Sequence, residues 1–189
     1  MTATSLSGGF SSPPEQSATA FRAVLESVAR PGTIWALGGA QPPEPLSVAA
    51  GTVLLTLADG TTPVHLAGDA NCQQVRDWIT FHIGAPLVDA KQAVFAVGRW
   101  QDLTPIGRFH HGDPDYPDRS ATLIVLVDGL TNSGARLTGP GIATDAWLSL
   151  PEIAAFQSNT AKFPLGLDFL LTAGAHMAAL PRSTKVESA

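Results

Sequence analysis

The chain has 189 residues, a length typical of one domain that buries its core without disulfide or metal, and a formal net charge of -5. It has no Lys/Arg cluster, no apolar run of the roughly 20 residues that span a bilayer, no signal peptide and one cysteine. These features exclude nucleic acid, a membrane and a disulfide framework, and favour the cytoplasm.

The share of charged residues is low, at 14% against a typical value of about 25%. A surface so poor in charge has two explanations. Either another subunit covers part of it, or the loops are polar and uncharged. The composition leaves both open.

The first half of the chain begins with a segment rich in Ser, Gly and Pro. We expect residues 1–16 to be flexible and residues 17–189 to form one domain. An amphipathic helix should follow, capped by Ser17 and stopped before Pro31. Its apolar face has the spacing i, i+3, i+4, i+7 and consists of Phe21, Val24, Leu25 and Val28.

Further helices and short strands follow in alternation. Residues 46–59 are apolar on nearly every side, which predicts a buried helix. Residues 69–84 predict an amphipathic helix capped by Asp69 or Asn71, with an apolar face formed by Val75, Trp78, Ile79, His82 and Ile83. Short strands are expected at residues 33–38, 62–68 and 93–98.

The second half contains the most apolar segment, residues 121–130, which predicts a strand buried on both faces. Residues 150–163 predict a helix, and residues 166–184 predict two strands that turn at Gly174 and Ala175. Because helices and strands alternate first and strands then pair locally, we expect an α/β layered domain with a mixed sheet.

The stretch HHGDPDYPD, from His110 to Asp118, contains five possible metal ligands: His110, His111, Asp113, Asp115 and Asp118. Adjacent histidines on an extended chain point in opposite directions, and there is no H-E-x-x-H pattern, cysteine pair or EF-hand spacing. We therefore expect no metal here, and interpret the stretch as a turn at a strand entrance, near a pocket or an interface.

Motifs for other chemistry are absent or weak. There is no G-x-S-x-G elbow, Walker A motif or dinucleotide fingerprint, and Cys72 is expected to be a small buried thiol. Five arginines could clamp a phosphate or phosphonate, although each is more often a surface ion-pair residue: Arg22, Arg30, Arg76, Arg119 and Arg182. A free-standing hydrolase and a phosphonate- or nucleotide-binding protein stay open as alternatives.

Several stretches, in this order, resemble the PhnH subunit of the bacterial carbon–phosphorus lyase system. They are FRAVLESVARPGTIWAL, VLLTLADGTTPVHL, FHIGAPLV, RSATLIVLV, LTGPGI and FPLGLDFLLTAGAHMAALPRSTKV. They extend from Phe21 to Val186, and the match depends on their order and spacing. The chain differs from the family at His65, where an aromatic residue is usual, in the HHGDPDYPD stretch and in the Ser-Gly N-terminus.

The resemblance implies an accessory or non-catalytic subunit of a cytoplasmic assembly that replaces the adenine of Mg-ATP with an alkylphosphonate. The product is a ribose 1-alkylphosphonate 5-triphosphate, and the G, I and J subunits are the partners that hold the catalytic centres. The implied fold is a three-layer αβα dimer, like a reduced pyridoxal-phosphate-dependent transferase without its cofactor. The lysines agree with this, because none of the three lies in a glycine-rich context suited to pyridoxal phosphate. They are Lys91, Lys162 and Lys185.

Four polar residues at the predicted ends of elements are our candidates for binding or contact: Arg30, Asp59, His82 and Arg119. Arg30 and Asp59 end helices, Arg119 precedes the long buried strand, and His82 lies near the end of its helix. Element ends are where α/β folds usually build sites. No catalytic residue can be assigned.

Overall fold

The computed structural model describes residues 7–188, which form a mixed α/β structure. Its α-helices are α1 (Pro13–Ala29), α2 (Val48–Leu57), α3 (Gln73–His82), α4 (Trp100–Leu103) and α5 (Ile153–Thr160). Its strands are β1 (Trp35–Ala36), β2 (Val64–Leu66), β3 (Phe95–Arg99), β4 (Thr122–Leu126), β5 (Ala135–Thr138), β6 (Ala146–Leu148), β7 (Asp168–Ala173), β8 (His176–Leu180) and β9 (Lys185–Glu187). None of the helices described is long and apolar enough to cross a membrane.

The larger sheet has six strands in the order β1-β8-β7-β4-β3-β2. Strands β2, β3, β4 and β7 are parallel neighbours, and β8 pairs antiparallel with both β7 and β1. The mixed sheet predicted from the sequence is thus confirmed, as is the hairpin that turns at Gly174 and Ala175. A smaller antiparallel sheet has the order β6-β5-β9.

Two hydrophobic cores lie on opposite faces of the larger sheet. One joins the sheet to α1, α2 and α3, and the other joins it to α4, α5 and the smaller sheet. Neighbouring residues of β4, Leu123 and Ile124, belong to different cores and are both fully buried. Side chains alternate between the faces of a strand, so this strand is buried on both, as predicted.

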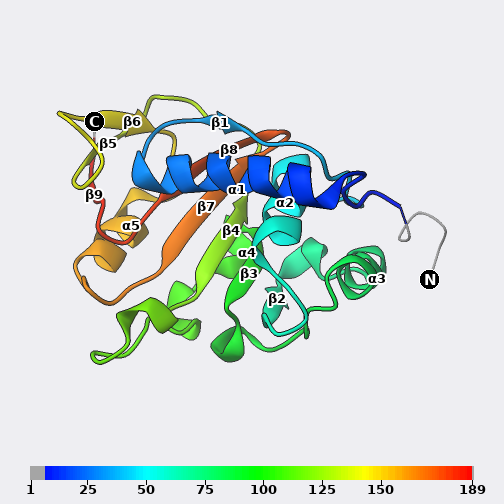
Figure 1. Cartoon of the computed structure of the whole chain (residues 1–189). Coiled ribbons are helices and arrows are strands. Elements are labelled where there is room, and N and C mark those ends of the chain that lie inside the picture. Colours follow the sequence, from blue (N-terminus) through cyan, green and yellow to red (C-terminus); the bar gives the residue numbers. More distant parts are fainter. Residues whose placement is uncertain (1–6, 189) are drawn as a thin grey trace.

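Helix α1 differs from the prediction in its start and in its buried face. It begins at Pro13 after the N-cap Ser12, so Ser17 lies inside the helix. Its buried residues are Ala20, Val24 and Ser27. Figure 1 shows α1 lying across the front of the larger sheet, and it packs against α2 and β8.

The predicted apolar face of α1 is only partly buried, because the helix turns its smaller side chains toward α2 and β8. Three large side chains on the other side of Val24 face outward: Phe21 is 52% exposed, Leu25 56% and Val28 41%. We call these three residues the α1 stripe. They form an apolar surface that the described part of the chain leaves uncovered.

Helix α3 buries three of the five residues of its predicted apolar face, whereas His82 and Ile83 are only partly buried, and its cap is not the predicted one. Val75, Trp78 and Ile79 are fully buried. The N-cap is Cys72, without a side-chain hydrogen bond. Asp69 instead lies in the short 3-10 helix η2 (Gly68–Ala70), and the Asn71 side chain binds Arg76.

Candidate functional site

The first two predicted site residues make local contacts at the ends of their helices. Arg30 is the C-cap of α1 and forms an ion pair with Glu26 at 3.3 Å. Asp59 follows α2, and its Oδ1 accepts hydrogen bonds at 2.8–2.9 Å from the backbone N–H and hydroxyl of Thr61 and from the hydroxyl of Thr62. The side-chain hydrogen bond from Thr61 is the main reason that the pKa of Asp59 is lowered.

The other two predicted site residues also have local partners. His82 Nε2 lies 3.1 Å from the Ser7 carbonyl oxygen, and its ring packs on Trp78 and Phe81. The guanidinium of Arg119 lies 3.9 Å from the centroid of the Tyr116 ring. Within residues 7–188, no hydrogen bond or ion pair joins any two of the four candidates.

The stretch from His110 to Asp118 forms a turn before β4. Asp113 and Tyr116 exchange backbone hydrogen bonds at 2.9 and 3.2 Å. His110 Nδ1 lies 3.0 Å from the Arg119 carbonyl oxygen, whereas His111 Nε2 lies 3.3 Å from that of Ile106. Throughout the part of the chain that is described, no group of three or more His, Cys, Asp or Glu side chains is placed to hold a metal ion.

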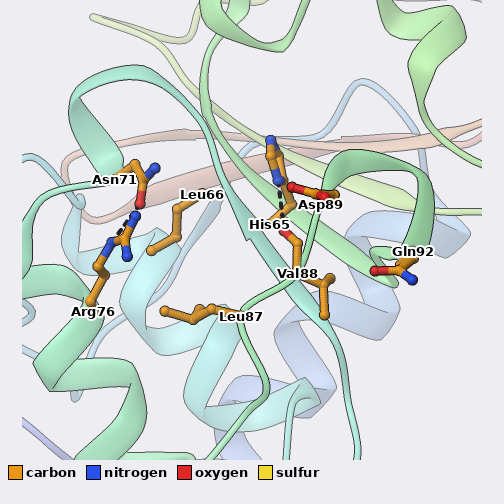
Figure 2. Close-up of a pocket in the computed structure, with 8 residues that line it drawn as sticks. All are labelled: His65, Leu66, Asn71, Arg76, Leu87, Val88, Asp89 and Gln92. Atoms are coloured by element: carbon orange, nitrogen blue, oxygen red, sulfur yellow. Dashed lines mark hydrogen bonds between the residues drawn. The ribbon is translucent and has the colours of Figure 1, made fainter.

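A polar cavity of about 370 Å³ lies at the open edge of the larger sheet, beside β2. We call it the edge cavity. Residues from β2, from the entrance of α3 and from the segment before β3 line it: His65, Leu66, Asn71, Arg76, Leu87, Val88, Asp89 and Gln92 (Figure 2).

The backbone of β2 leaves an unpaired peptide group in this cavity. On the outer edge of β2, Val64 N–H donates to the Pro86 carbonyl at 2.9 Å and Val88 N–H donates to the Val64 carbonyl at 3.0 Å. The next rung of a parallel ladder would join Leu66 N–H to the Val88 carbonyl. Instead, His65 Nδ1 donates to that carbonyl at 2.9 Å.

Consequently, Leu66 N–H and C=O face the cavity, because alternate residues of a strand direct their peptide groups to the same edge. Across the described residues, no hydrogen bond satisfies either group. Leu66 itself is only 5% exposed. Since peptide groups removed from water normally have partners, an unpaired one at a cavity wall is available for a ligand or water.

The side chains of the cavity carry opposite charges on its two sides (Figure 2). On one side, Arg76 Nε donates to Asn71 Oδ1 at 2.7 Å, which orients the guanidinium. On the other side lie Asp89 and Gln92, at the short 3-10 helix η3 (Ala90–Gln92). Neither Arg76 nor Asp89 forms an ion pair with any residue between 7 and 188.

A second cavity, of about 330 Å³, lies at the carboxyl ends of β3 and β4. Its main charged residues are already paired, because Arg99 binds Asp128 at 2.9 Å. Trp100 Nε1 donates to Glu152 at 2.9 Å beside it. The charged side chains of the edge cavity, unlike Arg99 and Asp128 here, are therefore free of ion pairs among the described residues and available to a ligand.

Of the five arginines considered as anion clamps, three have partners elsewhere. Arg30 binds Glu26, Arg119 lies on Tyr116, and Arg182 binds Asp168. Arg76 alone of the five lines the edge cavity. The sequence did not predict the other residues that line the edge cavity, because they come from separate segments of the chain. The signal it did give was His65, which differs from the residue usual in the family.

Comparison with known proteins shows similarity along almost the whole chain. Residues 8–187 match the sequence model of a family described as "Bacterial phosphonate metabolism protein (PhnH)". The chain is 38% identical over 190 residues to a Rhizobium meliloti (strain 1021) protein named alpha-D-ribose 1-methylphosphonate 5-triphosphate synthase subunit PhnH, covering 96% of this chain and 95% of the relative. It is 30% identical over 176 residues to a Stutzerimonas stutzeri protein named putative C-P lyase subunit protein HtxG, covering 89% of this chain and 84% of that relative.

Proposed function

The chain belongs to the PhnH family of bacterial phosphonate metabolism proteins, and we propose that it is an accessory, non-catalytic subunit of the carbon–phosphorus lyase core complex. In this role it is needed to make ribose 1-alkylphosphonate 5-triphosphate from Mg-ATP and an alkylphosphonate. The observation that carries the proposal is the match over 96% of the chain to a relative named as a subunit of such a synthase.

A free-standing hydrolase has less support. Nucleophilic hydrolysis needs a serine or cysteine within hydrogen-bond reach of a base. In residues 8–188 no serine or cysteine side chain bonds a histidine, and Cys72 Sγ instead lies 3.8 Å from the Glu44 carbonyl oxygen.

The proposed partners are the G, I and J subunits, with a symmetric homodimer of the isolated chain. The α1 stripe supports an interface of this kind, because contiguous exposed apolar side chains commonly mark protein contacts. Val28 of the stripe also lines an apolar cavity of about 220 Å³, together with Leu57 and Phe169. The low charged share of the composition has the same explanation.

We also propose that the chain works in the cytoplasm without pyridoxal phosphate or a metal of its own, as a reduced relative of the pyridoxal-phosphate-dependent transferase fold. A Schiff-base lysine needs surroundings that deprotonate its amine, usually by desolvation. All three lysines are exposed: Lys91, Lys162 and Lys185. In this proposal, Mg-ATP is a substrate of the complex.

The test is reconstitution of the complex. The chain should co-purify with the G, I and J subunits, and the assembly should release adenine from Mg-ATP and methylphosphonate only when the chain is present. The isolated chain should release none. Full activity of the other subunits without this chain, or turnover by the chain alone, would contradict the proposed role.

A further inference from the structure

The Arg76 side of the edge cavity is suited to an oxyanion. Its Nε–H is held by Asn71 at 2.7 Å, so the terminal nitrogens keep their donors in one orientation. Leu66 N–H faces the same cavity and has no partner in the described part of the chain. An arginine and a peptide N–H together form charge-assisted hydrogen bonds with phosphonate or carboxylate oxygens.

The Asp89 side of the cavity has the complementary character. Asp89 is exposed and forms no ion pair within residues 7–188. A carboxylate accepts hydrogen bonds from an ammonium group, which has three donors and no acceptor. The same carboxylate repels a ligand that carries negative charge alone.

From this pairing we propose that the edge cavity binds a small zwitterion with a phosphonate at one end and an ammonium at the other, such as an aminoalkylphosphonate. The phosphonate lies against Arg76 and the ammonium lies against Asp89, with the Leu66 N–H on the cavity wall as a further donor to the phosphonate. The choice of a phosphonate as the anionic group rests on the proposed function. The charge arrangement rests on the cavity alone.

His65 acts as a positioning residue in this arrangement. Its Nδ1–H donates to the Val88 carbonyl oxygen. Without this bond, the same oxygen would accept from Leu66 N–H as the next rung of the ladder. The imidazole thereby keeps the Leu66 amide open to the cavity. His65 is at the same time the position at which this chain differs from the usual family pattern.

The experiment is calorimetric titration of the purified full-length chain with four probes: 2-aminoethylphosphonate, methylphosphonate, β-alanine and ethylamine. We expect 2-aminoethylphosphonate to bind at least about tenfold more tightly than each of the others, because each lacks the phosphonate or the ammonium. Equal binding of methylphosphonate would overturn the ammonium end. Equal binding of β-alanine would overturn the phosphonate end, and no binding of 2-aminoethylphosphonate would overturn the site.

Two variants separate the ends of the cavity. Arg76→Gln should weaken both 2-aminoethylphosphonate and methylphosphonate by about tenfold or more. Asp89→Asn should weaken only 2-aminoethylphosphonate and so remove the preference between the two. Arg22→Gln, a change at an exposed arginine of α1, is the matched control and should leave both affinities unchanged. If Asp89→Asn still preferred 2-aminoethylphosphonate to methylphosphonate as the parent chain does, the proposal would be contradicted.

A third variant tests the positioning role. His65→Phe keeps a ring on β2 but frees the Val88 carbonyl to pair with Leu66 N–H. It should weaken 2-aminoethylphosphonate binding and leave ethylamine binding unchanged, whereas a purely structural role would leave the preference among the probes unaltered. These titrations use the isolated chain, so failure here with normal adenine release by the complex would reject the cavity's ligand and leave the subunit role intact.

Discussion

Asn159 and Leu167 exchange two hydrogen bonds that tie the end of α5 to the entrance of β7. Asn159 Nδ2 donates to the Leu167 carbonyl oxygen at 2.9 Å, and Leu167 N–H donates to Asn159 Oδ1 at 2.8 Å. Asn159 is 2% exposed and Leu167 is fully buried. One side chain thus satisfies both peptide groups of a core residue and fixes where β7 enters the sheet.

Replacing this asparagine should destabilise the fold. Asn159→Ala leaves the N–H and C=O of Leu167 unpaired in the core, and we expect the free energy of unfolding to fall by about 2–4 kcal/mol. Urea denaturation at neutral pH measures the change. Gln74→Ala, an exposed substitution on α3, is the control and should stay within about 0.5 kcal/mol of the parent chain. Similar losses in the two variants would show that the Asn159 bonds contribute little.

His111 should make stability depend on pH. Burial, with a further contribution from the charge of Lys162, lowers the pKa of His111 below its ordinary value of 6.5. As pH falls through 6.5, the unfolded chain takes up the proton before the folded chain does. The free energy of unfolding should therefore decrease from pH 6.5 down to the folded pKa.

The test compares His111→Gln with the parent chain. Glutamine can still donate to the Ile106 carbonyl but does not titrate, so this part of the pH dependence should disappear from denaturation curves between pH 7.5 and 5. His176→Gln changes an exposed histidine after the β7–β8 turn and should keep the parent profile. If His111→Gln also keeps it, the partly buried imidazole is not the cause.

The α1 stripe should hold the proposed homodimer together. Leu25→Arg places a charge on a side chain that is already 56% exposed in the single chain, so the fold should tolerate it. We expect sedimentation at micromolar concentration to give a dimer for the parent chain and a 19.6 kDa monomer for the variant. Arg22→Ala on the same helix should remain dimeric. A monomeric parent chain would contradict the homodimer.

Arg30 and Arg119 remain candidates for assembly function. Arg30 is exposed and has one ion pair, and Arg119 lies on the exposed Tyr116 ring, so each alanine variant should lose only about 0.5–1 kcal/mol of stability. Both should nevertheless impair growth on methylphosphonate as the sole phosphorus source. Thermal melts of the purified variants are the control. Normal growth of both, or failure explained by unfolding, would make these residues structural.

Pyridoxal phosphate should not attach to the chain. Because Lys91, Lys162 and Lys185 are exposed, none has the desolvated amine that favours a stable Schiff base. Incubation with the cofactor, borohydride reduction and peptide mass analysis should find no stoichiometric adduct on any of them. A single lysine modified to completion would reverse this proposal.

Much of the fold was predictable because its signals are local. The apolar run that becomes β4, the apolar segment that becomes α2 and the turn between β7 and β8 each depend on residues close together in the chain. Hydrophobic periodicity and turn-forming residues report this level of structure directly. The order of the matching stretches also pointed to the family.

Packing between distant segments decided which side of a helix is buried and which side is exposed. The spacing of Phe21, Val24, Leu25 and Val28 defines one helical face, but α2 and β8 cover Val24 and leave the other three exposed. The choice among possible caps of α3 was decided in the same way, since Asn71 binds Arg76 instead of the helix amides.

The edge cavity depends most strongly on the assembled fold. Leu66, Arg76 and Asp89 face one space only because the chain returns beside β2 at Leu87 before it enters β3. The sequence supplied the available charges and the unusual His65, which are properties of single residues. Their convergence, and the unpaired Leu66 peptide group, arise from hydrogen bonding between segments more than 20 residues apart, which no local pattern encodes.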